Sequence, residues 1–281
     1  VVPDLVAVGW VTLDRLGGEL RPGGAAYFAA VTAARQGLRV GVLTSHGPDF
    51  PLAVLPPGVE VVDVGAARTA VIRVEPGRGG RQLALEAAAS PIGAAALPVA
   101  WRGAPLAVVG PIAGEVDPEL AGSFRDASVA VLPQGWMRRL DPAGRLAPGP
   151  WEHAGLVLPH TQLLAVSAED IASCEAQARE WFQQVPLAVV TRGRDGALLF
   201  VNGERYHVEA DPAREVDDTG AGDVFATTLL VHYQREGNPW EAAGAAACAA
   251  AASVEGKGAD TIPDRAALEA RLAAYRRRRD G

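Results

Sequence analysis

The sequence predicts an α/β protein whose central sheet is mostly parallel, with helices on both faces of that sheet. Short apolar runs, such as Leu106–Gly110 and Leu187–Thr191, alternate with helical segments through the middle and C-terminal parts of the chain. This alternation is typical of the strand–helix–strand units that build parallel sheets. With 281 residues, 49% of them apolar, the chain can bury a sizeable core. Ligands of such sheets bind at the carboxyl ends of the strands, so functional residues are expected there.

Composition and charge exclude several classes of protein. A net charge of −7 and a pI near 5.3 argue against a nucleic-acid partner, which needs a basic surface. The chain has neither a signal-peptide pattern nor a strongly apolar run of about 18 residues, so we expect a cytoplasmic protein that does not bind membranes. Cys174 and Cys248 lack metal-ligand spacing and are expected to be free thiols. The only lysine, Lys257, does not complete a GxxxxGK(S/T) loop, which excludes a P-loop.

The N-terminal part of the chain predicts a strand, a loop and a helix. The apolar run at 5–10 indicates a buried strand, and the loop after it carries Asp14. The local pattern alone explains Asp14 as a loop or capping residue. The pair Gly23 and Gly24 then leads into a helix over about 25–36.

Three short strand-like runs follow at 59–64, 69–75 and 82–87, with a turn at 76–80 between the last two. The pattern leaves two arrangements open, a separate small sheet or an edge hairpin of the main sheet. Further on, strands are expected at 39–44, 106–110, 128–134, 187–191, 197–201 and 204–209, helices at 117–126 and 242–254, and a strand that runs into a helix at 163–182. Asn202-Gly203 predicts a tight hairpin turn between the last two strands.

The residues 216–230 read VDDTGAGDVFATTLL and combine small residues, acids and the start of a buried helix. The first backbone N–H groups of a helix have no partner inside it, so a phosphate can bind to them where the side chains are small. Asp223 stands in the first turn, where a carboxylate could take a proton from a hydroxyl beside that phosphate. The simpler alternative is that Thr219 or Asp218 merely caps a core helix.

The run DDTGAGDVF resembles the C-terminal signature of the ribokinase-like (PfkB) family of sugar and nucleoside kinases, whose pattern is DTxGAGDxF. The resemblance implies a three-layer ribokinase-like fold in which residues 1–281 form a single domain. It also implies a small β lid formed mainly by about 59–87 and nearby N-terminal strands. By position, Asp223 is the catalytic base, and the amides of Gly220, Ala221 and Gly222 form the anion hole.

The resemblance also implies residues that bind the acceptor. Asp14 lies where the family holds substrate hydroxyls, and Gly23 and Gly24 match the start of its GGxxxN motif, although Phe28 occupies the Asn position. The segment LPQGWMRRLD is similar to the QGxxR of the myo-inositol kinase-like branch, which places Gln134 and Arg138 near the substrate. From the residues alone, a solvated Arg138 is equally compatible with the sequence.

Donor and metal residues are implied in the same way. The TxGxxG segment assigns Thr191, Gly193 and Gly196 to the nucleotide site, and the loop at Lys257 and Gly258 resembles the one that closes over adenine.

The carboxylate of the family's NxxE motif acts on Mg²⁺ through water. Here Asp170 takes that place with Glu169 beside it, and Ser167 stands at the Asn position. Ser167 and Asp170 also fit simple helix capping. Asp217 aligns with the Asp that helps to hold a potassium ion in some members of the family.

The resemblance therefore implies a kinase that uses ATP and Mg²⁺ to phosphorylate a hydroxyl of a small sugar or polyol of the inositol type. K⁺ is a further candidate cofactor, because some members of the family hold it. A nucleoside kinase of the same family, or a catalytically silent sugar- or nucleotide-binding relative, is the alternative. The expected partners are small-molecule substrates and a second copy of the chain, paired through the lid.

Overall fold

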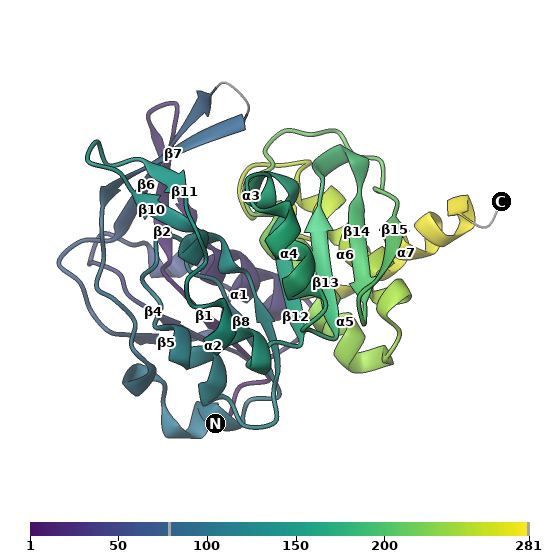
Figure 1. Cartoon of the computed structure of the whole chain (residues 1–281), viewed down its shortest axis with the longest axis horizontal. Coiled ribbons are helices and arrows are strands. Elements are labelled where there is room, and N and C mark those ends of the chain that lie inside the picture. The colour runs from purple at the N-terminus through teal and green to yellow at the C-terminus, as the bar shows by residue number, and fades with distance from the viewer. Residues whose placement is uncertain (78–79, 280–281) are drawn as a thin grey trace.

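A nine-stranded, mostly parallel sheet forms the centre of the molecule (Figure 1). In the computed structural model, which describes residues 1–77 and 80–279, its strand order is β15-β14-β13-β12-β9-β8-β1-β4-β5. All neighbours pair in parallel except β13 with β14 and β14 with β15. The strands are β1 (Leu5–Val8), β4 (Val40–Thr44), β5 (Glu60–Asp63), β8 (Leu106–Val109), β9 (Ser128–Val131), β12 (Leu163–Ser167), β13 (Leu187–Thr191), β14 (Ala197–Val201) and β15 (Glu204–Val208). The predicted α/β fold is confirmed.

Helices cover both faces of this sheet, and each face has its own hydrophobic core. One face carries α1 (Ala25–Arg35), α5 (Ala221–Glu236), α6 (Pro239–Ser253) and α7 (Arg265–Arg279). The other carries α2 (Ala154–Val157), α3 (Ala168–Ile171), α4 (Glu175–Phe182) and short 3₁₀ turns. The helix expected at 117–126 is only a 3₁₀ turn, Pro118–Ser123, and the helix expected after β12 is broken between α3 and α4.

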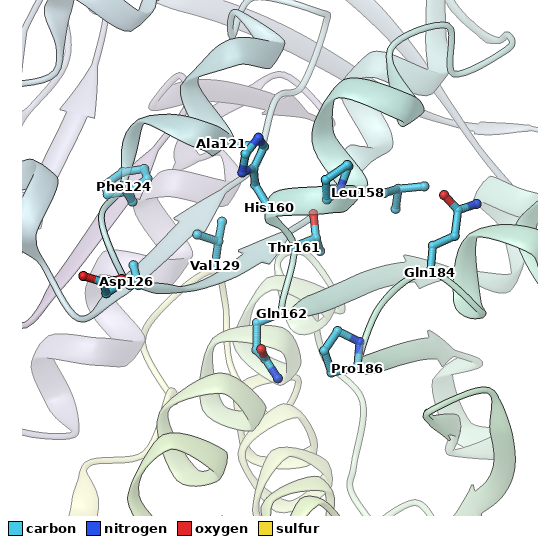
Figure 2. A pocket seen from close by; sticks show the side chains of 12 residues that line it. Ala121, Phe124, Asp126, Val129, Leu158, His160, Thr161, Gln162, Gln184 and Pro186 are labelled. Atoms are coloured by element: carbon cyan, nitrogen blue, oxygen red, sulfur yellow. The ribbon is translucent and has the colours of Figure 1, made fainter.

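The edge of the sheet formed by the amino-terminal ends of the parallel strands has a shallow hollow of about 340 Å³. It is opposite the carboxyl-terminal edge, where ligands of such sheets bind. Figure 2 shows Phe124, Leu158 and Gln184 around the hollow, near the starts of β9, β12 and β13. None of the residues that the sequence nominates for function lines this hollow. The hollow therefore lies apart from the candidate site described below.

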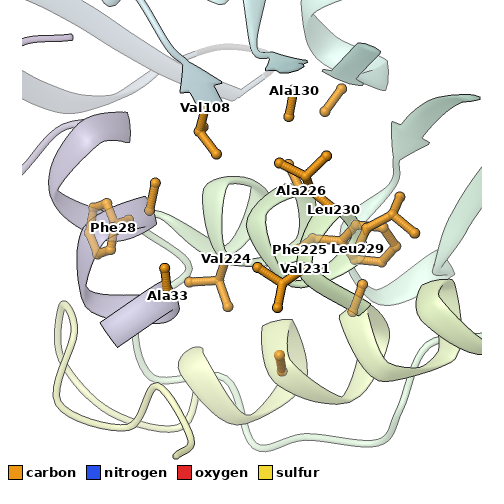
Figure 3. Packing of buried hydrophobic residues seen from close by; sticks show 14 of the residues in the cluster. Phe28, Ala33, Val108, Ala130, Val224, Phe225, Ala226, Leu229, Leu230 and Val231 are labelled. Atoms are coloured by element: carbon orange, nitrogen blue, oxygen red, sulfur yellow. The ribbon is translucent and has the colours of Figure 1, made fainter. Parts of the chain in front are cut away.

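Helix α5 is the central support of the first core (Figure 3). Its residues from Val224 to Val231 are all buried, and they pack between α1 and the strands β8, β9 and β12. The Phe28 ring of α1 lies on one side of this helix, and Val108 of β8 lies on another. A helix so fully enclosed holds its first turn in a fixed place at the edge of the sheet.

A second sheet of four strands, here called the small sheet, stands beside the main one (Figure 1). Its order is β3-β2-β6-β7, built from β2 (Thr12–Leu16), β3 (Glu19–Gly23), β6 (Ala70–Gly77) and β7 (Gly80–Ala87). The first of the three runs expected in 59–87 joins the main sheet as β5, and the other two join the small sheet. The turn expected at 76–80 lies partly outside the described residues. The hairpin β10 (Arg138–Leu140) and β11 (Leu146–Pro148) borders β7, where Leu85 N–H bonds to the Gly144 carbonyl at 2.8 Å.

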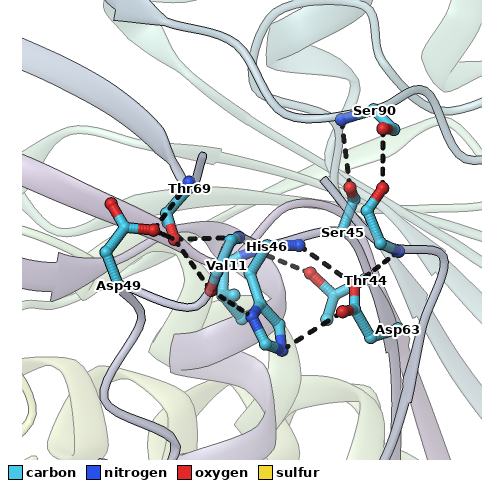
Figure 4. A network of polar contacts seen from close by, with 10 residues as sticks. Val11, Thr44, Ser45, His46, Asp49, Asp63, Thr69 and Ser90 are labelled. Carbon is cyan, nitrogen blue, oxygen red and sulfur yellow. Dashed lines mark hydrogen bonds and ion pairs between the residues drawn. The ribbon is translucent and has the colours of Figure 1, made fainter. Parts of the chain in front are cut away.

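Polar contacts fix the base of the small sheet to the end of β4 (Figure 4). Thr44 accepts the Val11 N–H at 2.9 Å, just before β2 begins. Asp49 accepts both the Thr69 hydroxyl at 2.7 Å and the Thr69 N–H at 3.0 Å, just before β6. Ser45 accepts the Ser90 N–H at 3.0 Å, shortly after β7. The small sheet is thus tied to the main sheet at the points where the chain enters and leaves it.

Candidate active site

The carboxyl ends of the parallel strands bring together loops that are far apart in sequence. A buried carboxylate, Glu115, joins the loops after β1 and β8, because it accepts N–H bonds from Trp10 at 3.2 Å, Ile112 at 2.9 Å and Ala113 at 2.8 Å. Burial raises the pKa of Glu115, and these backbone bonds oppose the shift. The chain turns from one half of the sheet to the other between β1 and β8, which is where ligands of such sheets bind.

Helix α5 begins beside this point with an open first turn. Gly220 has φ 78°, the left-handed region that favours glycine, and a Cβ there would lie 2.4 Å from the Phe28 ring. The Ala221 N–H bonds to the Asp218 carbonyl at 3.2 Å, while helix geometry leaves the N–H groups of Gly222 and Asp223 without partners inside the helix. A Cβ on Gly222 would meet nothing within 4 Å. The turn therefore offers amides to an anion that approaches from open space.

Asp223 stands in that first turn with its acidity strongly weakened. Burial, followed by the charges of Asp14 and Asp170, raises the pKa of Asp223 to about 7, and the charge of Arg138 opposes the rise. The residue is surrounded by protein but keeps some access to solvent, as a group at the floor of a cleft does. A carboxylate with a pKa near neutrality can both accept and release a proton at physiological pH.

Arg138 is the cation of this cluster. It is half-buried, and burial lowers the pKa of its guanidinium, whereas the charges of Asp170, Glu115 and Asp223 raise it. Its Nη1 donates to the Ile112 carbonyl at 3.2 Å, which holds the side chain over the loop after β8. The sequence left open whether Arg138 is solvated, and the structure places it among the acids.

Asp170 is held by hydrogen bonds on both of its oxygens. Its Oδ1 accepts the Gln134 amide at 2.9 Å, and its Oδ2 accepts the Ser167 hydroxyl at 2.7 Å and the Ser167 N–H at 3.0 Å. The Asp170 N–H returns a bond to the Ser167 hydroxyl at 3.1 Å, which completes a capping box. The capping role of Ser167 and Asp170 is present, and it brings Gln134 next to Asp170. Glu169 is exposed.

Asp14 projects from β2 of the small sheet and is buried, with the Thr12 hydroxyl donating to its Oδ1 at 2.7 Å. A Cβ on Gly23 would lie 2.1 Å from Asp14 Oδ2, so only glycine leaves room for this carboxylate. Gly24 has φ 96° and directly precedes α1. Asp14, Gly23 and Gly24 therefore form one local unit, close enough to Asp223 for the Asp14 charge to raise its pKa.

The residues nominated for the nucleotide lie in two segments, one at the end of β13 and one after α6. Thr191 ends β13 and pairs in register with Ser167, the last residue of β12. Gly193 and Gly196 have φ 54° and 77° in the turn between β13 and β14. Lys257 and Gly258 belong to the loop after α6, and the Gly258 N–H donates to Asp217 Oδ2 at 3.1 Å.

Metal-binding geometry is limited in the described structure. Within residues 1–77 and 80–279, no group of three or more His, Cys, Asp or Glu side chains could hold a metal ion. Asp170 already accepts hydrogen bonds on both of its oxygens, from Gln134 and from Ser167. Asp217 is engaged as well: its Oδ1 accepts the Thr219 N–H at 3.1 Å, and its Oδ2 accepts Gly258 and also Arg21, whose Nη1 lies at 3.3 Å.

Two residues of the site, Glu115 and Arg21, were not predicted from the sequence. Glu115 follows the strand end at Gly110, and an acid so close after a buried strand was a usable signal. Arg21 gave no signal, because it reaches Asp217 across 196 positions of sequence.

Comparisons with known proteins bear on the class of this site. Residues 156–265 match the model of the pfkB family carbohydrate kinases. A cytidine kinase of Thermococcus kodakarensis is 28% identical in an alignment 264 positions long, which covers 85% of this chain and 91% of that protein.

Two solved structures show the same fold. A pyrophosphate-dependent kinase of the ribokinase family, complexed with a pyrophosphate analogue and myo-inositol, has a TM-score of 0.79 and 22% identity over 95% of this chain and 99% of that one. Arabidopsis thaliana ribokinase, complexed with ribose and ATP, has a TM-score of 0.71 and 20% identity over 97% of this chain and 99% of that one.

Residues 156–265 therefore resemble the pfkB carbohydrate kinases, and the whole chain is similar in fold to solved kinases of the ribokinase family. Its relatives act on carbohydrates and nucleosides. No helix among the described residues is long and apolar enough to cross a membrane.

Proposed function

We propose that this protein transfers a terminal phosphoryl group to a hydroxyl of a small, neutral sugar or polyol of the inositol type, with Asp223 as the general base. The observation that carries the proposal is the placement of Asp223 at the start of a helix with open amides, where burial and the charges of Asp14 and Asp170 raise its pKa to about 7. Base and anion site are then built into one turn of α5.

The proton moves late in the reaction. A sugar hydroxyl is too weak an acid to be ionised beforehand by a carboxylate, so Asp223 accepts its proton as the new O–P bond forms. The N–H groups of Gly222 and Asp223 donate to phosphoryl oxygens as charge develops on them. Because these donors are fixed by the buried helix α5, they need no rearrangement at that moment.

The acceptor is held by Asp14, the turn at Gly23 and Gly24, and the pair Gln134 and Arg138. Carboxylates accept hydrogen bonds from hydroxyls, and Arg138 donates to oxygen acceptors. The cluster of Asp14, Asp170 and Asp223 around a single guanidinium repels an anionic acceptor, which favours a neutral one. The small sheet that carries Asp14 acts as the lid of this site.

The donor is proposed to be ATP with Mg²⁺. Thr191, Gly193 and Gly196 hold the nucleotide on one side, and Lys257 and Gly258 hold it on the other.

Asp170, with Glu169, would hold Mg²⁺ through water, and the ion would supply positive charge that neutralises the phosphates. The hydrogen bonds already made by both Asp170 oxygens support this indirect contact. Pyrophosphate is the alternative donor to test, because the kinase complexed with myo-inositol is pyrophosphate-dependent.

A nucleoside acceptor is the second candidate. It is favoured by the cytidine kinase, which aligns with 85% of this chain. A third alternative, a silent sugar- or nucleotide-binding relative, would have no need of a base beside the anion site.

The test is a phosphoryl-transfer screen with ATP and pyrophosphate as donors and a panel of sugars, inositols and nucleosides as acceptors. Wild type and Asp223→Asn are assayed in parallel. Loss of the general base is expected to lower turnover by about 10²- to 10⁴-fold. Binding of donor and acceptor, measured by calorimetry, should persist in the variant.

The matched control is Asp126→Asn, at the amino-terminal edge of the sheet, where φ of 53° suits asparagine as well as aspartate. It should keep wild-type turnover. If Asp223→Asn turns over its acceptor as fast as the control does, the base assignment is wrong. If the wild type binds a donor but phosphorylates no acceptor, the silent relative becomes the better reading.

Two further expectations belong to this proposal. A homodimer paired through the small sheet is tested by light scattering after size-exclusion chromatography. A cytoplasmic location is tested by fractionation of cells that express the protein.

A further inference from the structure

Asp217 does not have the geometry of a cation ligand in this chain. Its side chain is only 7% exposed, and both of its oxygens accept hydrogen bonds, from Thr219 on Oδ1 and from Gly258 on Oδ2. A guanidinium already stands 3.3 Å from Oδ2, on Arg21. Burial alone would raise the pKa of Asp217, but these hydrogen bonds and the Arg21 charge hold it below its ordinary value. A potassium ion at this carboxylate would be repelled by a fixed positive charge.

Arg21 reaches Asp217 from the small sheet. It lies on β3 and pairs directly across from Asp14 of β2, so both side chains are on the same face of that sheet. A second charge pair supports the contact, because Glu19 of the same strand accepts a hydrogen bond from Arg21, and this bond is the largest cause of a lowered Glu19 pKa. The charge of Lys257, in the loop after α6, lowers the pKa of Glu19 further. Strand β3 therefore lies against the signature segment and the loop of Lys257 and Gly258.

We propose that Arg21 takes the place of a monovalent cation at Asp217, so that this kinase needs no potassium ion to order the loop at Gly258. Arg21 is then a positioning residue. Its charge keeps Asp217 ionised, Asp217 holds the Gly258 N–H, and the loop stays beside the start of α5. Because Arg21 and Asp14 share a face of the small sheet, the same contact ties the acceptor side of the site to the donor side.

This inference rests on the proposed function for its effect on turnover, but its first test does not. Melting temperatures of wild type and Arg21→Ala are measured in potassium, sodium and choline chloride at equal ionic strength. The wild type should melt at the same temperature in all three salts. Arg21→Ala opens a site beside Asp217, so potassium should raise its melting temperature above the choline value by about 3 °C.

The controls are chosen from the same strands. Arg15→Ala removes an arginine of β2 that pairs with Glu86 and not with Asp217, and it should show no potassium effect. Arg21→Lys keeps a cation and should remain insensitive to potassium. Asp217→Asn combined with Arg21→Ala should lose the potassium effect, because the carboxylate is gone.

Turnover gives the second readout. The wild type should be equally active in the three salts, and Arg21→Ala should lose activity in choline and regain several-fold of it in potassium. A wild type that is stabilised or activated by potassium overturns the inference, and so does an Arg21→Ala variant that melts identically in the three salts. Failure to find any acceptor would affect the proposed function alone, since the melting experiment uses the protein without substrates.

Discussion

At the scale of single residues, the site is a small cluster of charged side chains around Asp223. Asp14 and Asp170 raise the pKa of Asp223, and Arg138 lowers it, while burial makes the largest contribution. The two other carboxylates and the single guanidinium act in opposite directions, and the pKa of the Asp223 carboxyl is about 7. Asp223 is the member that stands in the first turn of α5, where the developing phosphoryl charge is expected.

The raised pKa of Asp223 predicts how kcat/KM depends on pH. Asp223 must be ionised to accept a proton, so kcat/KM should fall as the pH drops below about 7. Arg138→Gln removes the charge that favours the ionised form, so the pKa of Asp223 should rise and the acid limb should move to higher pH. The measurement is the pH dependence of kcat/KM for both proteins with one acceptor.

Arg139→Gln is the control for this profile. Arg139 is the exposed neighbour of Arg138 and pairs with Glu152 at 2.9 Å, away from the cluster. Its acid limb should coincide with that of the wild type. An acid limb that moves to lower pH in Arg138→Gln would contradict the assigned direction, whatever the loss of activity from weaker acceptor binding.

At the scale of elements, the start of α5 separates two roles of glycine. Gly220 serves the fold, since its φ is 78° and a Cβ would meet the Phe28 ring at 2.4 Å. Gly222 is not required by packing, since a Cβ there meets nothing within 4 Å of the protein, and its proposed role is to leave the approach to the amides open. The two glycines stand two positions apart and face different neighbours.

We therefore predict opposite outcomes for the same substitution at these positions. Gly220→Ala should lower the free energy of unfolding by about 1–3 kcal/mol, from backbone strain and the clash with Phe28. Gly222→Ala should leave it unchanged or raise it by up to about 1 kcal/mol, because alanine favours a helix over glycine. Yet it should cut kcat/KM by about 10²-fold, because its methyl group occupies the approach to the amides.

Urea unfolding and steady-state kinetics on the same preparations check both variants. A Gly222→Ala variant with full activity would show that no anion approaches this turn. A Gly220→Ala variant as stable as the wild type would show that Phe28 can move aside.

The elements that can be predicted from the sequence are those that have a local sequence pattern. Strands, the hairpin at Asn202 and Gly203, and the helix start at Gly220 have local patterns, and all are present. The helix expected at 117–126 failed, because after the Asp117 cap the chain makes only a 3₁₀ turn before Phe124 becomes extended. Local helix propensity is a weak signal that the tertiary context readily overrides.

The candidate site was predictable only where residues sit in a motif. The segment around Asp223 has one, and so do Gly23 and Gly24. The pairing of Arg21 with Asp217 and of Glu115 with Trp10 joins segments 196 and 105 positions apart, and no periodicity in the sequence reports it. These contacts arise when strand ends meet at one edge of the folded sheet.

At the scale of the whole molecule, the C-terminal helix is fastened to the body by a buried carboxylate. Asp211 follows β15, its side chain is 2% exposed, and it bonds to Arg271 and Arg278 of α7. Arg271 also pairs with Glu255 at 2.9 Å, in the segment after α6. Helix α7 packs on α6, and α6 packs on α5, so the fastening supports the helix that begins at the site.

The last prediction concerns this fastening. Asp211→Asn leaves two arginines facing a buried neutral group, so the free energy of unfolding should fall by about 2–4 kcal/mol, below the range for fully enclosed pairs because Arg278 is half exposed. Glu269→Gln removes an exposed pair with Arg265 at 2.9 Å on the same helix, and it should cost less than about 0.5 kcal/mol. Thermal and urea unfolding measure both variants. Equal losses would mean that the Asp211 pairs contribute no more to stability than an exposed ion pair does. A large loss in Asp211→Asn with unchanged kcat/KM at low temperature would show that α7 stabilises the site without taking part in the chemistry.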